Sequence, residues 1–465
     1  MRQTTYFESF SARQLLDDYP VDERFAQRHR ALSRDALFAQ QDAAFRRCLA
    51  RAWQIPFYQR LWGAHGVEPG DIDGLRDIGK LPVFGKHEIM QSVAANPPLG
   101  DFHGWRDGSD AGNVPLIFHT TSGTTGRPQP LLFSPRSREV QSLLLARLYR
   151  WQGMRAGDVV HSVYGHGMIN GGHYVREAVT HYTQALFCSA GTGVETRSAQ
   201  QVQLMRDLRA TVIVGFADYI KKLADVAREA GIEPGRDIPL RMVCGHLGRE
   251  SRAALSATWG GVELFDWYGV GDTGAIAGEG PDHDGMYLME DAQYVEILDV
   301  DSGLGADDGA PGDMVVTCLY KDDIYPIIRF NTHDVTRTLT SPSSLGLNLR
   351  RIEGFLGRSD NMVKIRGINV FPQAFAPILE TQPRYAGEFL CVATRDDAGR
   401  DALAVQVEVS GSSDDAALTD IFAQTLRARL GVEVGVQLCA LGSLATQTGI
   451  ETRQKPIRLL DKRFE

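Results

Sequence analysis

Apolar residues recur with a helical period in the first part of the chain. Between residues 34 and 60 they are spaced by about 3.6 residues, at Leu37, Phe38, Ala43, Phe45, Leu49 and Trp53. Residues 1 to about 85 are therefore expected to form a packed helical cap. Another helix is expected to start at Ser134 and Pro135 and to stop at Gly153.

From residue 159 onward, short apolar runs alternate with amphipathic segments. We expect strands over 159–163, 211–216, 240–244 and 263–265, and helices over 198–208, 218–230 and 249–258. This alternation predicts an α/β fold with a mostly parallel sheet covered by helices. Ligands of such sheets bind beyond the carboxyl ends of the strands.

The remaining chain predicts two smaller units. Residues 285–338 are expected to form a β-rich subdomain. Strands over 388–394, 403–409 and 436–439, with a helix over 415–430, predict a small C-terminal α/β unit.

Composition and charge narrow the class of protein. The 465 residues are enough for two or three domains, and 43% hydrophobic with 23% charged residues is ordinary for a soluble globular protein. A net charge of −9 argues against a nucleic-acid partner and gives no support for docking on anionic lipid. No apolar run of about 18 residues is present, and residues 1–19 lack an apolar signal core. Six scattered cysteines without a C-x-x-C pair favour a reducing cytoplasm.

The main candidate for chemistry is a glycine-rich stretch at 119–128, which reads H-T-T-S-G-T-T-G-R-P. Its glycines let the backbone approach a ligand closely, and successive amides in such a loop can form a concave nest for an anion, to which hydroxyl groups add donors. Because apolar runs flank it at 116–118 and 131–133, we expect strand–loop–strand and not a Walker A loop. A surface hairpin with a polar tip is the alternative. The expected phosphate cradle consists of Thr121, Ser122, Gly123, Thr124, Thr125 and Gly126.

The order of these residues resembles the phosphate-binding signature of the adenylate-forming enzymes, S/T-S-G-S/T-T-G-x-P-K. Gln129 stands where the signature has its final lysine, and Arg127 supplies a nearby cation. Further stretches at 164–172, 325–334, 355–372 and 455–463 are similar, in the same order, to motifs of the phenylacetate–CoA ligases. The chain resembles that family from about residue 80 to residue 463.

The resemblance implies where the adenine lies. The stretch Trp267, Tyr268 and Gly269 matches the family's Y-G motif, whose aromatic residue stacks near the adenine. Gly245 and His246 stand in an altered form of the adenine-side motif, where the acidic side chain is lost and the backbone role survives.

The resemblance also implies contacts to ribose, phosphate and metal. Asp334 would accept hydrogen bonds from both ribose hydroxyls, a task for which a carboxylate has the capacity, whereas a bare aspartate after a strand is more often a cap. Arg358 would contact ribose or phosphate. Asp272 replaces the family's glutamate and would bind Mg²⁺ through oxygen.

The loop at 164–172 resembles the Y-G-Y-G-L-F-T-G-G loop of phenylacetate–CoA ligases, which implies an aromatic acid as substrate. Its glycines, Gly171 among them, let a backbone wall approach a flat ring, and Tyr164 and Ile169 supply apolar faces. His166 is either an acid/base group or a polar residue that lines the pocket.

The stretch 355–372 resembles the family's hinge between a large N-terminal adenylation domain, here 1–357, and a mobile C-terminal lid, here 358–465. Asp360 is the implied pivot, and Lys364, Arg366 and Gly367 lie on the CoA side. In the tail, Lys455 matches the family's catalytic lysine by spacing and is otherwise a solvated side chain. Its ammonium would neutralise charge where the carboxylate meets the α-phosphate.

Taken together, the resemblance implies ATP-dependent activation of a carboxylic acid to acyl-AMP, followed by transfer to the thiol of CoA, with ATP, Mg²⁺ and CoA as cofactors. Small molecules are the expected partners, without nucleic acid or membrane, and a homodimer is expected. One alternative keeps the first step and changes the acceptor to a carrier protein, an amine or a deazaflavin coenzyme. The other, motivated by the altered positions 245–247 and 271–272, is a nucleotide-binding protein without ligase activity.

Overall fold

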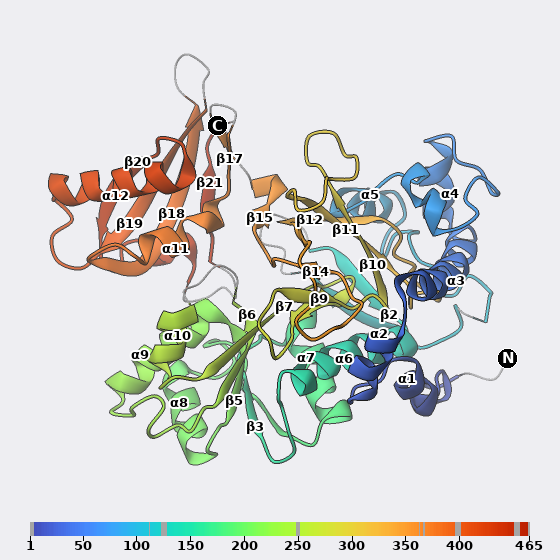
Figure 1. Ribbon diagram of the computed structural model, residues 1–465, viewed down its shortest axis with the longest axis horizontal. Coiled ribbons are helices and arrows are strands. Elements are labelled where there is room, and N and C mark those ends of the chain that lie inside the picture. The colour runs from blue at the N-terminus through green and yellow to red at the C-terminus, as the bar shows by residue number, and fades with distance from the viewer. Residues whose placement is uncertain are drawn as a thin grey trace.

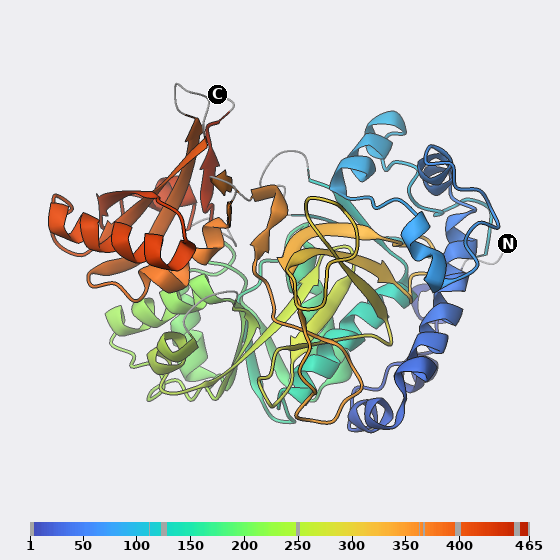
Figure 2. The same cartoon turned by 45° about the horizontal axis from the view of Figure 1, so that its top comes forward.

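The computed structural model describes residues 4–110, 112–121, 128–247, 252–361, 363–365, 368–395, 401–450 and 456–463. Within these residues a large body carries a smaller C-terminal part, which lies over the helices that Figure 1 colours green. The N-terminal helices cover the opposite end of the body (Figure 2).

The N-terminal residues form the expected helical cap. Its helices are α1 (Ala12–Asp18), α2 (Arg24–Ala31), α3 (Arg34–Ala52), α4 (Pro56–Gly63) and α5 (Lys86–Ala95), with the 3-10 turns η1 (Tyr6–Glu8) and η2 (Leu75–Lys80). Apolar side chains of α3, including Leu37 and Phe45, are buried in the main core. The apolar pattern at 34–60 is divided between two helices, because Pro56 lacks an amide hydrogen and starts a new helix. No helix among the described residues combines the length and the apolar character needed to cross a bilayer.

A nine-stranded sheet, in the order β13-β14-β9-β8-β7-β6-β5-β3-β4, forms the centre of the body. Its parallel half contains β3 (Val159–Ser162), β4 (Leu186–Ser189), β5 (Val212–Phe216), β6 (Met242–His246) and β7 (Glu263–Val270). The helices of this half are α6 (Pro135–Trp151), α7 (Asn170–Tyr182), α8 (Ser198–Asp207), α9 (Ala217–Glu229) and α10 (Arg252–Thr258). Four of the five residues of β5 are buried, as expected for a parallel strand covered on both faces.

At β7 the pairing changes from parallel to antiparallel. The second half of the sheet contains β8 (Gly274–Glu279), β9 (Met286–Leu288), β13 (Thr338–Leu339) and β14 (Arg351–Ile352). A separate antiparallel sheet contains β10 (Gln293–Leu298), β11 (Gly312–Cys318), β12 (Phe330–Thr336) and β15 (Gly357–Arg358). These strands confirm the predicted β-rich segment. The pairing of β1 (Ile117–Thr120) with β2 (Pro130–Phe133) confirms the strands expected on either side of the glycine-rich stretch.

The C-terminal part has its own sheet and core, so the predicted fold class is confirmed. The sheet order is β20-β19-β18-β21, with β18 (Tyr385–Arg395), β19 (Asp401–Val409), β20 (Gly435–Ala440) and β21 (Leu459–Asp461). Its helices are α11 (Ala376–Leu379), α12 (Ala416–Leu430) and α13 (Ala445–Thr448). Short elements precede them: η3 (Ser359–Asn361), β16 (Val363–Ile365), β17 (Ile368–Val370) and η4 (Pro372–Ala374). The buried cluster that contains Phe389, Val405 and Phe422 is made of described residues from 363 onward.

Two glycine-rich stretches differ from expectation. Residues 266–274 extend the strand expected at 263–265, because they are the end of β7 and a tight turn into β8, in which Gly269 pairs with Ala275. A Cβ at Gly269 would lie 2.3 Å from the Gly274 carbonyl oxygen, so the hairpin itself needs this glycine. Residues 170–172, expected as loop, form the first turn of α7, and β4 was not predicted.

Candidate active site

The two ends of the glycine-rich bend are held together at a fixed point. Beyond the last pair of the β1–β2 hairpin, the Thr121 amide donates to the Gln129 carbonyl at 3.0 Å, and the Gln129 amide donates to the Thr121 hydroxyl at 3.1 Å. The tip of the bend lies outside the described residues, and with it the predicted Ser122, Gly123, Thr124, Thr125 and Gly126.

The two residues where the ends of the bend meet, Thr121 and Gln129, are here called its neck. The predicted acid-pocket loop lies directly beside this neck. The Thr120 amide donates to the Met168 carbonyl at 2.7 Å, and Thr120 forms a parallel bridge with Ile169. The loop thus brings its glycines to the phosphate bend. A Cβ at Gly171 would meet the Tyr164 ring only at 3.9 Å, so packing does not require this glycine.

His166 is held by groups that the sequence did not identify. Its Nε2 lies 2.6 Å from the Ser189 hydroxyl at the end of β4, and its backbone amide donates to the Glu195 carboxylate at 3.1 Å. Burial lowers the pKa of His166 below its usual value, which favours the neutral imidazole. The arrangement fits a polar lining residue.

An aromatic cluster lies where four parallel strands end. Tyr164 follows β3, and its ring centre lies 5.2 Å from that of Phe216 on β5. His246, the last residue of β6, lies 4.2 Å from the Trp267 ring on β7, and its Nδ1 is 2.9 Å from the Trp267 carbonyl oxygen. Phe216 was missed, although its place at a strand end before a helix is where ligands of such sheets bind. A Cβ at Gly245 would lie 1.8 Å from the Gly215 carbonyl oxygen, so contact between strands explains this glycine.

A chain of hydrogen bonds joins the predicted ribose residues. Asp334 is 7% exposed and accepts from the Tyr268 hydroxyl at 2.5 Å and from Arg358 Nη1 at 2.8 Å. Arg358 faces Asp334 across β12 and β15, and donates to both oxygens of Asp360 at 2.7 and 2.6 Å. Burial and the nearby Asp334 charge raise the pKa of Tyr268 well above its usual value, so its hydroxyl stays protonated and donates.

The backbone of β12 is irregular next to Asp334. The register between β11 and β12 shifts between Asp313 and Val315, and His333 adopts a left-handed φ of 56°. The hydrogen bond to Asp313 raises the pKa of His333, which favours the charged imidazole beside that carboxylate. Such bulges re-aim side chains at functional sites, and this one turns Asp334 toward Tyr268.

The predicted metal ligand Asp272 lies in a buried polar cluster. Its side chain is 3% exposed, and its Oδ1 accepts from the Gln129 side-chain amide at 2.7 Å and from the Tyr325 hydroxyl at 3.1 Å. The Lys321 ammonium donates to the Asp272 backbone carbonyl at 2.9 Å. Burial raises the pKa of Asp272 to about 6, against the lowering effect of Lys321. Sequence reasoning missed these partners because Gln129 and Asp272 are 143 residues apart.

The described residues contain no group of three or more histidine, cysteine or acidic side chains suited to a metal ion. A metal at this site would therefore be held by Asp272 together with substrate phosphates and water, which is how Mg²⁺ is usually bound in nucleotide enzymes.

The predicted lid residues fall partly within the described structure. Asp360 lies in η3, and Lys364 pairs with Asn369 in the β16–β17 hairpin, although the Lys364 side chain is not described. Arg366, Gly367 and Lys455 lie outside the described residues.

Two ion pairs join the C-terminal part to helix α9. Lys221 lies 3.3 Å from Glu380, and Asp218 lies 3.4 Å from Arg458. Arg458 also donates to the Phe389 carbonyl at 2.9 Å, so it links α9 to the sheet of the C-terminal part.

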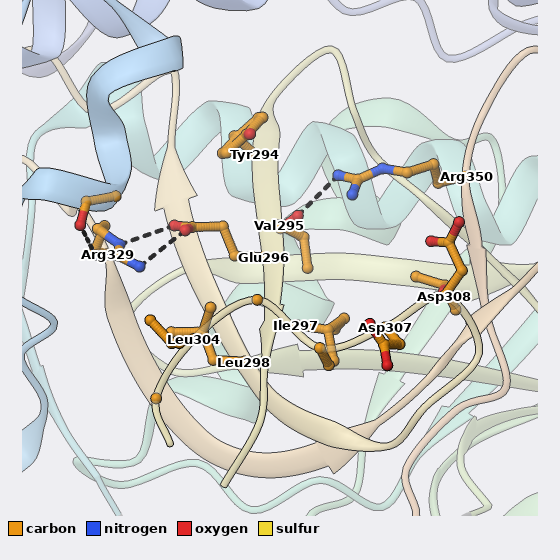
Figure 3. A pocket seen from close by; sticks show the side chains of 15 residues that line it. Tyr294, Val295, Glu296, Ile297, Leu298, Leu304, Asp307, Asp308, Arg329 and Arg350 are labelled. Carbon is orange, nitrogen blue, oxygen red and sulfur yellow. Dashed lines mark hydrogen bonds and ion pairs between the residues drawn. The ribbon is translucent and has the colours of Figure 1, made fainter. Parts of the chain in front are cut away.

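A hollow of about 370 Å³ lies away from these residues, on the β-rich subdomain (Figure 3). Tyr294 and Leu304 line it. On one side, Arg329 forms a bidentate ion pair with Glu296, in which Nη2 donates to Oε1 at 2.9 Å and Nε donates to Oε2 at 3.1 Å. No predicted site residue of the described structure lines this hollow.

Comparison with known proteins places the chain among acid-activating enzymes. The family described as AMP-binding enzyme C-terminal domain matches residues 367–463. The phenylacetate-coenzyme A ligase of Aromatoleum evansii is 30% identical over 429 residues, which cover 88% of this chain and 91% of the relative.

Two solved states of one enzyme, 2-hydroxyisobutyryl-CoA ligase, also match. The postadenylation state in complex with R3-HIB-AMP gives a TM-score of 0.78 at 25% identity and covers 92% of this chain and 89% of that one. The thioesterification state in complex with 2-HIB-AMP and CoA gives a TM-score of 0.63 at 26% identity. The match covers 92% of this chain and 90% of that one. The arrangement of this chain is therefore more similar to the postadenylation state.

Proposed function

The chain belongs to the phenylacetate–CoA ligase family of adenylate-forming enzymes, and on that premise we propose that it joins an aryl or arylacetic acid to coenzyme A. It is an AMP-forming acid–CoA ligase, which uses ATP and CoA and passes through an acyl-AMP. The acid class is supported by the aromatic rings at the strand ends, where the ring centres of Tyr164 and Phe216 lie 5.2 Å apart.

One observation carries the assignment of the nucleotide site. The Asp334 carboxylate is held by Tyr268 and Arg358 in a bulged strand beneath the hinge at Asp360. A carboxylate has acceptor capacity beyond these two bonds, which fits the two ribose hydroxyls. We assign the adenine to the neighbouring residues, namely Gly245, His246, Trp267, Tyr268 and Gly269.

In the first step, a carboxylate oxygen of the acid attacks the α-phosphorus of ATP. A phosphorus–oxygen bond forms, the bond to the bridging oxygen breaks, and pyrophosphate leaves. Both reactants are anions, so cations must offset their repulsion. We assign the leaving phosphates to the bend 121–126 and the neutralisation of the reacting oxygens to Lys455.

Asp272 is the residue that would hold Mg²⁺, which would supply positive charge to the transferring group. Gln129 and Tyr325 donate to Oδ1 of Asp272 and so orient its carboxylate.

In the second step, the thiol of CoA attacks the acyl carbon, a carbon–sulfur bond forms and AMP leaves. We propose that the C-terminal part, residues 358–465, turns about Asp360, removes Lys455 and brings Lys364, Arg366 and Gly367 to the thiol. The separate core of that part supports a movement as one unit. Exclusion of water by the closed lid protects the mixed anhydride.

Two further expectations concern the assembly and its location. We propose a homodimer, which light scattering after gel filtration would test. We also propose a reducing cytoplasm, which the six unpaired cysteines support.

The decisive experiment is a pyrophosphate-release screen over aryl, arylacetic and alkyl acids, with and without CoA. We expect release with aryl acids in the absence of CoA, and acyl-CoA only when CoA is added. Release confined to alkyl acids would overturn the acid class. Release without any acyl-CoA would assign another acceptor, such as an amine or a carrier protein.

A further inference from the structure

A lysine from a distant part of the chain lies beneath the neck of the glycine-rich bend. Lys321, which follows β11, is 0% exposed, and its ammonium donates to the Asp272 carbonyl at 2.9 Å. The ammonium lies 4.8 Å from the ring centre of Phe133 on β2 and 4.6 Å from that of Tyr325. Lysines are almost never fully buried unless they are paired, so this position indicates a specific partner.

The hydrogen-bond partner is the backbone carbonyl of Asp272, and the charge of the nearby Asp272 carboxylate opposes the lowering of the Lys321 pKa by burial. The other acidic side chain near Lys321 is Asp323, whose oxygens accept from the Ser134 hydroxyl and from the Ile324 amide. Burial raises the pKa of the Cys318 thiol to about 12, so this third neighbour is neutral.

Two departures from the adenylate-forming signatures contact each other at this point. Gln129 replaces the final lysine of the bend, Asp272 replaces a glutamate, and their side chains share a hydrogen bond of 2.7 Å. The bend therefore lacks a cation at position 129, while Lys321 places one at the backbone carbonyl of Asp272.

The charge balance matters because ATP is a polyanion. A carboxylate buried beside the neck repels incoming phosphates strongly, since little water screens it. A buried ammonium next to that carboxylate offsets the repulsion, and its bond to the Asp272 carbonyl also fixes the turn between β7 and β8.

Resting on the proposed function, we propose that Lys321 is a positioning residue for ATP. It compensates the charge of Asp272 and holds the 271–273 turn against Gln129, so that the neck of the bend accepts the polyphosphate. In this role it replaces the lysine that the bend lacks at position 129.

The test measures ATP binding by calorimetry in EDTA, so that neither catalysis nor metal contributes. Lys321→Gln keeps a donor for the carbonyl and removes the charge, and we expect its Kd for ATP to rise about tenfold. Lys321→Gln combined with Asp272→Asn removes both charges and should restore the Kd to within about threefold of the wild type. Gln129→Lys combined with Lys321→Gln should also recover binding.

Controls separate the outcomes. Lys80→Met, at an exposed lysine paired with Asp77 at 2.8 Å, should bind ATP as the wild type does. If Lys321→Gln does not fold, as shown by a lost thermal transition, the two double variants are compared directly with the wild type. Double variants that bind as weakly as Lys321→Gln, or a Lys321→Gln protein that binds normally, would overturn the role of Lys321. A wild type that binds ATP neither in EDTA nor with added Mg²⁺ would instead overturn the proposed nucleotide site.

Discussion

At the scale of single residues, the proposed nucleotide site is tested first at Asp334. Asp334→Asn removes the charge that Tyr268 and Arg358 now face. Hydrogen bonds to charged groups contribute roughly 1.5–3 kcal/mol, so we expect kcat/KM for ATP to fall about 100-fold, while KM for the acid changes little. Tyr268→Phe removes one hydrogen-bond donor to Asp334, so kcat/KM for ATP should fall about tenfold. Pyrophosphate release measures both, and an Asp334→Asn enzyme with an unchanged KM for ATP would contradict the ribose assignment.

A second residue, Phe216, tests the acid pocket. Its ring lies 5.2 Å from Tyr164 and 5.0 Å from His246, at the end of β5. Phe216→Ala removes a ring face, so we expect KM for arylacetic acids to rise about tenfold, with KM for ATP unchanged. A short alkyl acid serves as the control, because it buries less surface against the ring. Equal effects on KM for ATP and for the acid would show that the ring has only a structural role.

At the scale of elements, the turn η1 is anchored to helix α6 by one buried carboxylate. Glu139 accepts from the hydroxyls of Tyr6 and Tyr182, both at 2.6 Å, and lies 3.2 Å from Nδ1 of His181. The hydrogen bond to Glu139 raises the pKa of His181. Burial alone would raise the pKa of Glu139, but the bonds from His181, Tyr182 and Tyr6 lower it below its usual value.

The two shifts define a pH window for this anchor. The raised pKa of His181 gives stability that is fully present below its unfolded value of about 6.5 and is lost as pH rises through the folded value. The lowered pKa of Glu139 gives stability that is lost as pH falls through its folded value. We therefore expect His181→Ala to lower the urea midpoint more at about pH 5.5 than at about pH 8.5. Glu139→Gln should abolish that difference, and an equal loss at both pH values would contradict the anchor.

Much of the element order followed from local patterns. The alternation after residue 159 predicted β3, β5, α8 and α9 because their apolar faces have a clear period. Ser134 predicted the start of α6, and its hydroxyl does accept from the Ser137 amide. The glycine-rich stretches did not predict their own structure, because Gly269 lies in a hairpin and Gly171 in the first turn of a helix.

The contacts that make the site could not be predicted in the same way. The bond between Gln129 and Asp272 and the position of Lys321 depend on segments far apart in the chain, and periodicity carries no information on which distant segments pack together. Family motifs indicated Asp334 and Arg358 separately. Their direct ion pair comes from the pairing of β12 with β15, a two-residue strand that no alternation pattern reveals.

At the scale of the whole molecule, the proposed turn of the C-terminal part requires that it hold one position for adenylation and leave it for thioester formation. Its core is separate, and ion pairs to α9 secure the present position, with side chains between 12% and 29% exposed. Ion pairs at the surface contribute about 0.2–1 kcal/mol each, and these partly buried pairs lie near the upper end of that range, which is enough to bias the position and weak enough to release it.

The last prediction follows from that balance. Lys221→Glu places a negative charge opposite Glu380 and should weaken the adenylation position. We expect the rate of pyrophosphate release to fall about two- to fivefold, whereas transfer from preformed acyl-AMP to CoA is unchanged or faster. The double variant Lys221→Glu with Glu380→Lys restores the ion pair with the two charges exchanged, so it should recover the rate of pyrophosphate release. The substitution Lys222→Glu at the neighbouring residue is the matched control. Equal loss in both half-reactions, or no recovery in the double variant, would show that this contact does not select between the two positions of the lid.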